Sequence, residues 1–187
     1  KDTLRATGLT TKREAVELHR VDPAVDLAEL ARYTARSSVP PEVSLSIEVG
    51  DDVPLIDGHH DALARPLSNV MLNAVEACRD NGTARIASAA IVVGVHRVTS
   101  RGAPSVELSV RDSGCGISPE HLSRIWEPYV THKPGGTGLG LAIARQTVQA
   151  HGGEVTAESE PGRRTTIRFI FPVTGSNALP PRSVDTA

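Results

Sequence analysis

Residues 66–79 read PLSNVMLNAVEACR and belong to a helical pattern that extends over 60–79. Apolar side chains recur there at steps of three and four residues, which predicts a helix with one buried face. That face is formed by Leu63, Leu67, Val70, Met71, Ala74 and Cys78. Asn69 and Asn73 lie four residues apart, so their amides project from the same side of the helix. An amide oxygen is a neutral, hard ligand of the kind that Mg²⁺ shares with phosphates. Asn residues at such positions also commonly cap or bridge neighbouring elements.

The segments around this helix alternate between helical and strand patterns. The other predicted helices are 26–37, a short one that begins at Ser118, and 139–151. The predicted strands are 43–49, 53–56, 86–98, 106–111, 155–158 and 165–171. Asp26 and Glu29 have the spacing of a capping box, and Asn81-Gly82 suits the end of the 60–79 helix. Strands 86–98 and 106–111 predict an antiparallel hairpin. We therefore expect an α+β sandwich, with about three helices packed on one face of a mostly antiparallel sheet.

Composition narrows the class of protein. The 187 residues carry 20 Lys plus Arg and 22 Asp plus Glu, a net charge of −2, which argues against a broad surface for nucleic acid. Aromatic residues make up only 3%, too few to stack nucleic-acid bases and few enough to predict an aliphatic core. Two cysteines, Cys78 and Cys115, indicate a reduced compartment rather than a disulfide scaffold. The longest apolar run is too short to span a bilayer. We expect a cytoplasmic domain with no direct contact with a membrane or nucleic acid.

The pattern along the chain suggests one folded domain with two flanking segments. We expect residues 1–22 to be a linker or the end of an upstream segment, 23–172 to fold, and 173–187 to be a disordered tail. The chain starts at Lys1 rather than at a methionine, so we expect it to be part of a longer protein.

Three further motifs follow the Asn pair. Asp112-Ser-Gly114-Cys-Gly116 comes directly after a strand, where a carboxylate could accept a hydrogen bond from an exocyclic amine such as adenine N6. The segment 125–133, IWEPYVTHK, places two of the five aromatic residues in a region that is otherwise loop-like, as in a flap. Residues 135–141, GGTGLGL, open the 139–151 helix, where exposed amides at the positive helix end favour an anion.

Each of these motifs has an ordinary structural alternative. DxGxG also occurs in a turn in which Asp satisfies local amides. The aromatic pair could be a small cluster beneath a long loop. The glycine-rich helix start matches neither a Walker loop nor a Rossmann turn. His59-His60 could suggest a metal pair, but no third ligand has the required spacing, so we expect exposed histidines there.

The order and spacing of the four motifs are more specific than any one of them. Over about residues 25–172 the chain resembles the catalytic and ATP-binding domain of bacterial sensor histidine kinases, in the GHKL ATPase superfamily. LSNVMLNAVEA resembles the N box, DSGCGI the G1 box, IWEPYVTHK the F box and GGTGLGLAIAR the G2 box. NAVEA and GTGLGL are closest to the nitrogen-regulator-like branch. The resemblance implies a Bergerat-type fold with residues of about 115–137 as a flexible ATP lid.

The resemblance also implies ligands and roles. Asn73 would coordinate the Mg²⁺ that bridges the ATP phosphates, and Asn69 would line the same catalytic pocket. Asp112 would accept from adenine N6. The other residues implied to bind ATP are Gly114, Gly116, Lys133, Gly136, Thr137, Gly138, Leu139, Gly140 and Thr165.

Two departures from the family bear on the reaction. Gyrase-like and chaperone-like relatives have a Glu as general base at the position of Asn69, and an amide cannot take a proton. Many histidine kinases have a basic residue at the position of Glu76, so a phosphate contact is not expected there. We therefore expect transfer of the γ-phosphoryl of ATP to another acceptor rather than hydrolysis.

The expected acceptor is a histidine on a dimerisation hairpin upstream, because His19 lacks the surrounding motif. A response regulator receiver domain would then take the phosphoryl group, and the parent protein could be anchored in a membrane. The alternatives are a nucleotide-binding pseudokinase that serves as a regulatory interaction module, and a serine kinase or a mitochondrial-type dehydrogenase kinase of the same fold.

Overall fold

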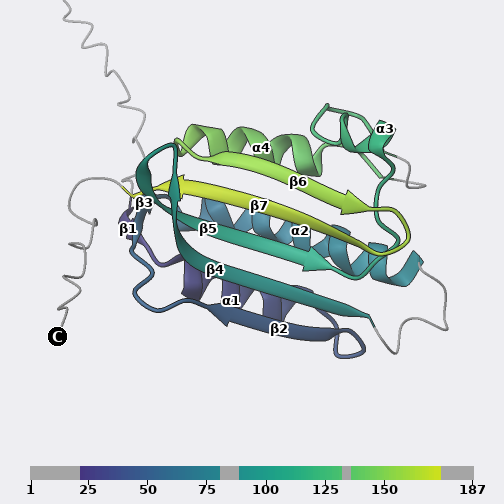
Figure 1. The fold of residues 1–187 in the computed structure, drawn as a ribbon, viewed down its shortest axis with the longest axis horizontal. Coiled ribbons are helices and arrows are strands. Elements are labelled where there is room, and N and C mark those ends of the chain that lie inside the picture. Colours follow the sequence, from purple (N-terminus) through teal and green to yellow (C-terminus); the bar gives the residue numbers. More distant parts are fainter. Residues whose placement is uncertain (1–21, 81–88, 132–135, 174–187) are drawn as a thin grey trace, which may run out of the picture.

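The computed structural model describes residues 22–80, 89–131 and 136–173, and it shows a five-stranded sheet with helices on one face (Figure 1). The elements in chain order are β1 Asp22–Val25, α1 Leu27–Ser38, β2 Ser44–Val49, β3 Ile56–Gly58, α2 His60–Asp80, β4 Ala90–Ser100, β5 Ala103–Asp112, α3 Pro119–Leu122, α4 Gly140–Ala150, β6 Glu154–Glu160 and β7 Arg164–Pro172. The strand order in the large sheet is β2-β4-β5-β7-β6. Only the β2–β4 pair is parallel. The predicted α+β sandwich is confirmed.

The core lies between the sheet and helices α1, α2 and α4, which cover its inner face (Figure 1). Side chains alternate across each strand, so every second residue of the central strands faces this core. The inward residues include Ile91, Val93, Val95, Val106, Leu108, Val110, Ile167, Phe169 and Phe171, all buried. Leu67 and Met71 of α2 pack against them and have no exposed surface. The core is largely aliphatic, as the composition predicts, with both Phe residues on β7.

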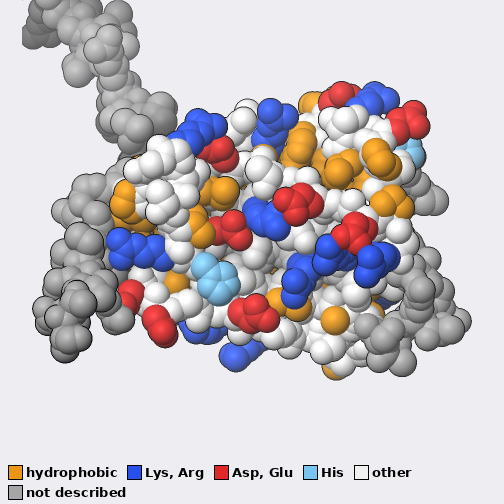
Figure 2. All heavy atoms as spheres, in the orientation of Figure 1, with side chains coloured by type: hydrophobic (Ala, Val, Ile, Leu, Met, Phe, Trp, Pro, Cys, Tyr) orange, Lys and Arg blue, Asp and Glu red, His pale blue; other side chains and the backbone are white. Residues whose placement is uncertain are grey.

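Among the described residues, no helix covers the outer face of the sheet (Figure 1), and many charged side chains lie on it (Figure 2). Acidic and basic side chains from neighbouring strands alternate across it. Arg168 of β7, for example, lies 2.9 Å from Glu158 of β6 and 3.7 Å from Glu107 of β5. Ion pairs at a solvent-facing surface contribute little to stability, so the fold depends on the inner face. None of the helices in the described part of the chain is both long and apolar enough to span a lipid bilayer.

The structure differs from the predicted elements at three places. β3 is Ile56–Gly58 rather than 53–56, because Pro54 has no amide hydrogen to donate to a strand partner. β1 was not predicted; it pairs antiparallel with β3, and Val25 lies opposite Ile56. The β4–β5 hairpin turns at Arg101 and Gly102, whose φ angles are 50° and 79°, so the strands extend further than predicted. The Asn81-Gly82 helix end and residues 86–88 lie outside the described residues.

The two helices that frame the candidate site are joined at one end by His151. The His151 Nε2 accepts a hydrogen bond from the His59 backbone N–H at 3.2 Å, next to the start of α2. The His151 Nδ1 donates to the Thr147 carbonyl of α4 at 2.8 Å, because a carbonyl can only accept. Gly58 leaves room for the ring, since a Cβ there would lie 2.9 Å from it. One imidazole therefore fixes the start of α2 against the end of α4.

Replacing His151 tests this connection. We expect His151→Ala to lower the free energy of unfolding by about 1–3 kcal/mol, because two half-buried hydrogen bonds are lost. His60→Ala is the matched control; His60 is exposed and pairs with the exposed Asp61, so a change below about 0.5 kcal/mol is expected. Urea denaturation measures both, and equal losses would contradict the role given to His151.

Candidate functional site

A buried carboxylate lies at the end of the central strand. Asp112 is the last residue of β5, is 6% exposed, and stands opposite Ile91 of β4 and Thr165 of β7. Its Oδ1 accepts a hydrogen bond from the Gly114 N–H at 2.9 Å. Burial raises the pKa of the Cys78 thiol of α2, and the charge of Asp112 raises it further, so the carboxylate lies close to this helix. Asp112 is thus held between the sheet and α2.

The loop after Asp112 is fixed to α2 by backbone contacts. A Cβ on Gly114 would lie 2.6 Å from the Ala77 carbonyl carbon, so only glycine fits against the helix here. The next residue, Cys115, donates its N–H to the Ala77 carbonyl at 3.1 Å. On the sheet side, the Ser113 N–H donates to the Ala90 carbonyl at 3.0 Å. The Ser113 Oγ in turn accepts a hydrogen bond from the Ala90 N–H at 2.9 Å. The DSGCGI motif therefore has one defined path between α2 and β4.

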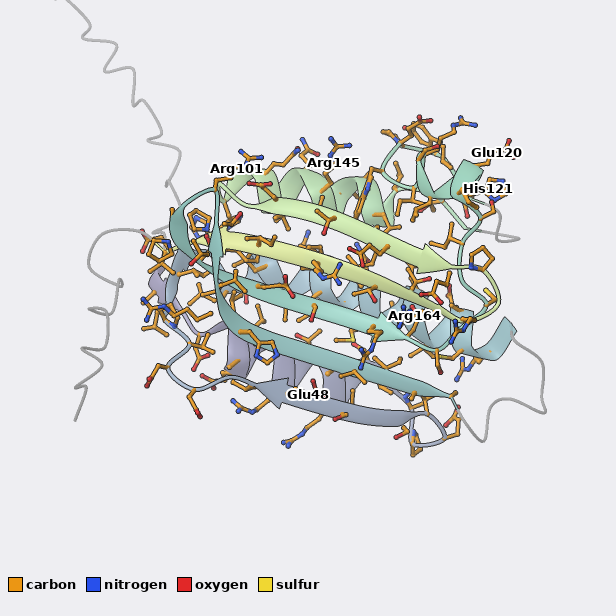
Figure 3. The ribbon with its side chains drawn as sticks, in the orientation of Figure 1. Glu48, Arg101, Glu120, His121, Arg145 and Arg164 are labelled. Atoms are coloured by element: carbon orange, nitrogen blue, oxygen red, sulfur yellow. The ribbon has the colours of Figure 1, made fainter. Side chains whose placement is uncertain are left out.

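The same loop is held on its other side by the β6–β7 turn. Gly116 has a φ of 67°, and a Cβ there would lie 2.9 Å from the Cα of Pro161. The Gly162 N–H donates to the Cys115 carbonyl at 2.6 Å, and the Ile117 N–H donates to the Ser159 Oγ at 2.8 Å. Figure 3 shows Arg164, which follows this turn, at the same end of the molecule as Glu120 and His121 of α3. Arg101 lies at the other end. The candidate site lies at this end.

Thr165 belongs to the same cluster. It is 5% exposed, stands opposite both Asp112 and Ser159, and its Oγ1 lies 3.0 Å from the Ser159 Oγ. The structure thus brings Thr165, Asp112, Gly114 and Gly116 together, and their role in binding a nucleotide stays a prediction.

The amide pair lies where α2 meets α4. The Asn69 Nδ2 donates to the Gly140 carbonyl at 3.2 Å, so one amide is joined to the first residue of α4. Asn73 follows one turn later in α2 and is half-buried. The N-cap of α4 is Leu139, which has no side chain that could cap the helix. The first amides of a helix carry partial positive charge, and the start of α4 lies here against Asn69.

The segment before α4 is tied to the aromatic motif. The Tyr129 N–H donates to the Gly138 carbonyl at 3.0 Å, and Gly138, with a φ of 66°, leaves no space for a Cβ against Tyr129. Ile125 and Trp126 pack against the core, whereas the Tyr129 side chain is 79% exposed. Gly136 and Thr137 are exposed. Lys133 lies outside the described residues, so its role stays a prediction.

Sequence reasoning missed residues that shape the site through their backbone or a short side chain. The Ala77 backbone packs against Gly114 and accepts a hydrogen bond from Cys115. The hydroxyls of Ser113 and Ser159 fix the loop on its two sides by hydrogen bonds. The only signal for Ala77 was a small residue one turn after Asn73 on the same helix. Ser113 and Ser159 had no distinctive spacing.

The donor set fits a nucleotide with Mg²⁺ better than a metal held by protein alone. Within 22–80, 89–131 and 136–173, no group of three or more His, Cys, Asp or Glu side chains could hold a metal ion. Mg²⁺ takes few protein ligands when phosphates supply the others, and an amide oxygen such as that of Asn73 is a suitable one. Gly114 and Gly116 are packed against the backbone of Ala77 and Pro161, which fixes the loop beside the Asp112 carboxylate.

Comparison with protein families identifies this arrangement. A family model described as histidine kinase-, DNA gyrase B-, and HSP90-like ATPase matches residues 58–175. The chain belongs to this family. The matched range of this ATPase domain contains all four motifs, and the resemblance seen in the sequence is confirmed.

The relatives of this ATPase domain include sensor kinases. The sensor histidine kinase ZraS of Escherichia coli (strain K12) is 32% identical over 159 residues, which are 83% of this chain and 32% of ZraS. The sensory histidine kinase/phosphatase NtrB of Azospirillum brasilense is 31% identical over 166 residues, 87% of this chain and 40% of NtrB. The chain thus spans about a third of the length of the curated relatives it matches.

Solved structures show the same fold. The catalytic domain of histidine kinase ThkA is 26% identical with a TM-score of 0.62, and the match covers 80% of this chain and 93% of that one. Full-length ShkA in complex with AMPPNP is 27% identical with a TM-score of 0.68, covering 83% of this chain and 32% of that one.

A pair of glycine variants tests how tightly the loop is held. Gly116 and Gly162 both have a positive φ, 67° and 75°. A Cβ added at Gly116 would clash with backbone atoms, whereas one added at Gly162 would have no atom within 4 Å. We expect Gly162→Ala to cost about 1–2 kcal/mol of stability from its φ alone. Gly116→Ala should cost about 2 kcal/mol more, because the β6–β7 turn must shift. Urea denaturation compares them, and losses of equal size would show that the loop and the turn are not in contact.

Proposed function

We propose that this ATPase domain binds Mg-ATP and transfers its γ-phosphoryl group to a histidine on a separate helical hairpin. The observation that carries the proposal is the buried Asp112 carboxylate, set beneath a loop that only glycine can form, at the end of the sheet where α2 meets α4.

Adenine recognition would depend on Asp112. A carboxylate can accept about four hydrogen bonds, so Asp112 can accept from adenine N6 in addition to the Gly114 N–H. Burial strengthens such a bond, because water does not compete for the carboxylate. Gly114 and Gly116 would shape the pocket by holding the loop close to α2 and to the β6–β7 turn, and Thr165 would close this end of the pocket.

The phosphates would lie at the start of α4. The backbone amides of Gly138, Leu139 and Gly140 form the positive end of this helix, and Gly136 and Thr137 lead into it. The hydrogen bond from Asn69 to the Gly140 carbonyl would position this helix end against α2. Lys133 would add a positive charge from the lid. Glu76, which is acidic, would not contact the phosphates.

Mg²⁺ would be held by the Asn73 amide oxygen together with phosphate oxygens. The ion would neutralise charge on the transferred group, so the domain itself mainly positions the nucleotide. Asn69 occupies the place where a water-activating base would stand, and an amide cannot accept a proton. Transfer to another protein group is therefore favoured over hydrolysis.

The partners would be those of a two-component sensor kinase. The relatives ZraS and NtrB are sensor histidine kinases by name, and this chain corresponds to a part of each. The acceptor histidine would lie on a dimerisation hairpin of the same parent protein. A response regulator receiver domain would take the phosphoryl group from it in the cytoplasm.

Nucleotide selectivity tests the role of Asp112. The wild-type domain should bind ATP more tightly than inosine triphosphate, whose ring presents an acceptor instead of the N6 amine. In Asp112→Asn the loss of the charged acceptor should weaken ATP binding by roughly 10- to 100-fold and remove this preference, since an amide can donate to the inosine oxygen. Isothermal titration calorimetry measures both ligands. Asp51→Asn, in an exposed turn, is the control, and a retained preference in Asp112→Asn would refute the assignment.

Phosphoryl transfer tests the proposed reaction itself. The domain is mixed with γ-labelled ATP, Mg²⁺ and a separately produced hairpin of the parent protein, and we expect label on the hairpin that is labile in acid and stable in base. Asn73→Ala should reduce the rate by about 100-fold or more through loss of Mg²⁺ positioning, whereas Leu72→Ala, an exposed neighbour, should not. Acid-stable label would favour a serine kinase. ATP binding without any label would favour a non-catalytic nucleotide-binding module.

A further inference from the structure

The two cysteines of the chain lie next to one another in the folded domain. The Cys115 N–H bonds the carbonyl of Ala77, the residue directly before Cys78, at 3.1 Å. Covalent geometry then limits the distance between the two Cα atoms to about 7 Å, because each Cα lies within one peptide unit of this hydrogen bond. Disulfides join Cα atoms that are about 4.4–6.8 Å apart, so a small movement of the loop would suffice.

The two thiols differ in their surroundings. Cys78 is 1% exposed on α2, whereas Cys115 in the loop is half-buried and therefore more exposed to solvent. Burial, followed by the nearby charge of Asp112, raises the pKa of the Cys78 thiol, although hydrogen bonds with Ser113 work against this shift. Cys78 therefore stays protonated at neutral pH, and an oxidant reaches Cys115 first.

We propose that Cys78 and Cys115 form a reversible disulfide that controls access to the Asp112 pocket. A low-molecular-weight disulfide such as oxidised glutathione is the oxidant. The Cys115 thiolate attacks one of its sulfurs and releases a first thiol. Cys78 then loses its proton and attacks the Cys115 sulfur, which releases the second thiol. Two protein thiols are oxidised to one disulfide, and one small disulfide is reduced to two thiols.

The bond would change the site because of where its sulfurs lie. Cys78 contacts Ser113, the residue between Asp112 and Gly114, so the linked sulfurs would stand beside the carboxylate. The sulfur of Cys115 must also move toward α2, although Gly114 already touches Ala77 there without space for another atom. The loop would have to shift, and Asp112 Oδ1 would lose the Gly114 N–H that now orients it. This consequence rests on the proposed binding of adenine by Asp112.

Oxidation of the intact domain tests the disulfide directly. The reduced protein is incubated with increasing oxidised glutathione, remaining thiols are blocked, and peptides are mapped by mass spectrometry. We expect a peptide in which Cys78 is linked to Cys115 within one chain. A stable glutathione adduct on Cys115 beside a free Cys78, or a link between two chains, would overturn the proposal.

Calorimetry with Mg-ATP on the same samples tests the effect on the site. We expect affinity to fall roughly tenfold after oxidation, as when a buried hydrogen bond is lost, and to recover with dithiothreitol. Cys115→Ser should bind like the reduced protein and should not respond to the oxidant, whereas Cys78→Ala should stop at a glutathione adduct on Cys115, because the second thiol is missing. Cys115→Ser alone decides the outcome if Cys78→Ala unfolds, since Cys115 is not in the core.

The two proposals fail in different ways. A linked peptide with unchanged Mg-ATP affinity would overturn the control of access but leave the nucleotide site in place. A reduced protein that does not bind Mg-ATP would refute the proposed function, while the peptide map would still report on the cysteine pair.

Discussion

Between Gly114 and the Ala77 backbone there is no room for a Cβ atom, and this contact positions the rest of the site. It brings the loop after β5 against the last turn of α2, the helix that carries both Asn residues. The Cys115 N–H and the Ala77 carbonyl then fix the direction of the loop. Because Asp112 comes directly before this loop, its carboxylate is held between the sheet and α2, where water has little access.

The second part of the site depends on how α4 lies against α2. His151 joins the two helices at one end, and Asn69 reaches the first residue of α4 at the other. The start of α4 is thereby kept against Asn69, one helical turn before Asn73, so the proposed phosphate and metal groups would lie close together. The segment that leads into α4 is joined to the aromatic motif by the hydrogen bond from the Tyr129 N–H to the Gly138 carbonyl.

Residues with no catalytic chemistry thus determine what the reactive ones can do. Ala77, Ser113 and Ser159 supply only backbone groups and hydroxyls, but they set the path along which Asp112 is presented. The same path brings Cys115 close to Cys78. A chain that sequence alone marks as free of structural disulfides therefore holds a pair of thiols next to its candidate binding carboxylate.

The sequence by itself determined the parts of this protein that depend on local periodicity and on motif order. The stripe from Leu63 to Cys78 defined α2, Asp26 defined the start of α1, where its side chain caps two amides, and the four ordered motifs defined the family. Contacts between distant segments were set by the tertiary structure. β1 has only four residues, one of them a proline, and it forms a strand by pairing with β3. Ala77 shapes the site because Gly114 packs against its backbone. Side-chain periodicity indicates which face of an element is buried, but not which residues of another element will contact that face. These contacts between elements place Asp112, Thr165 and the two cysteines together.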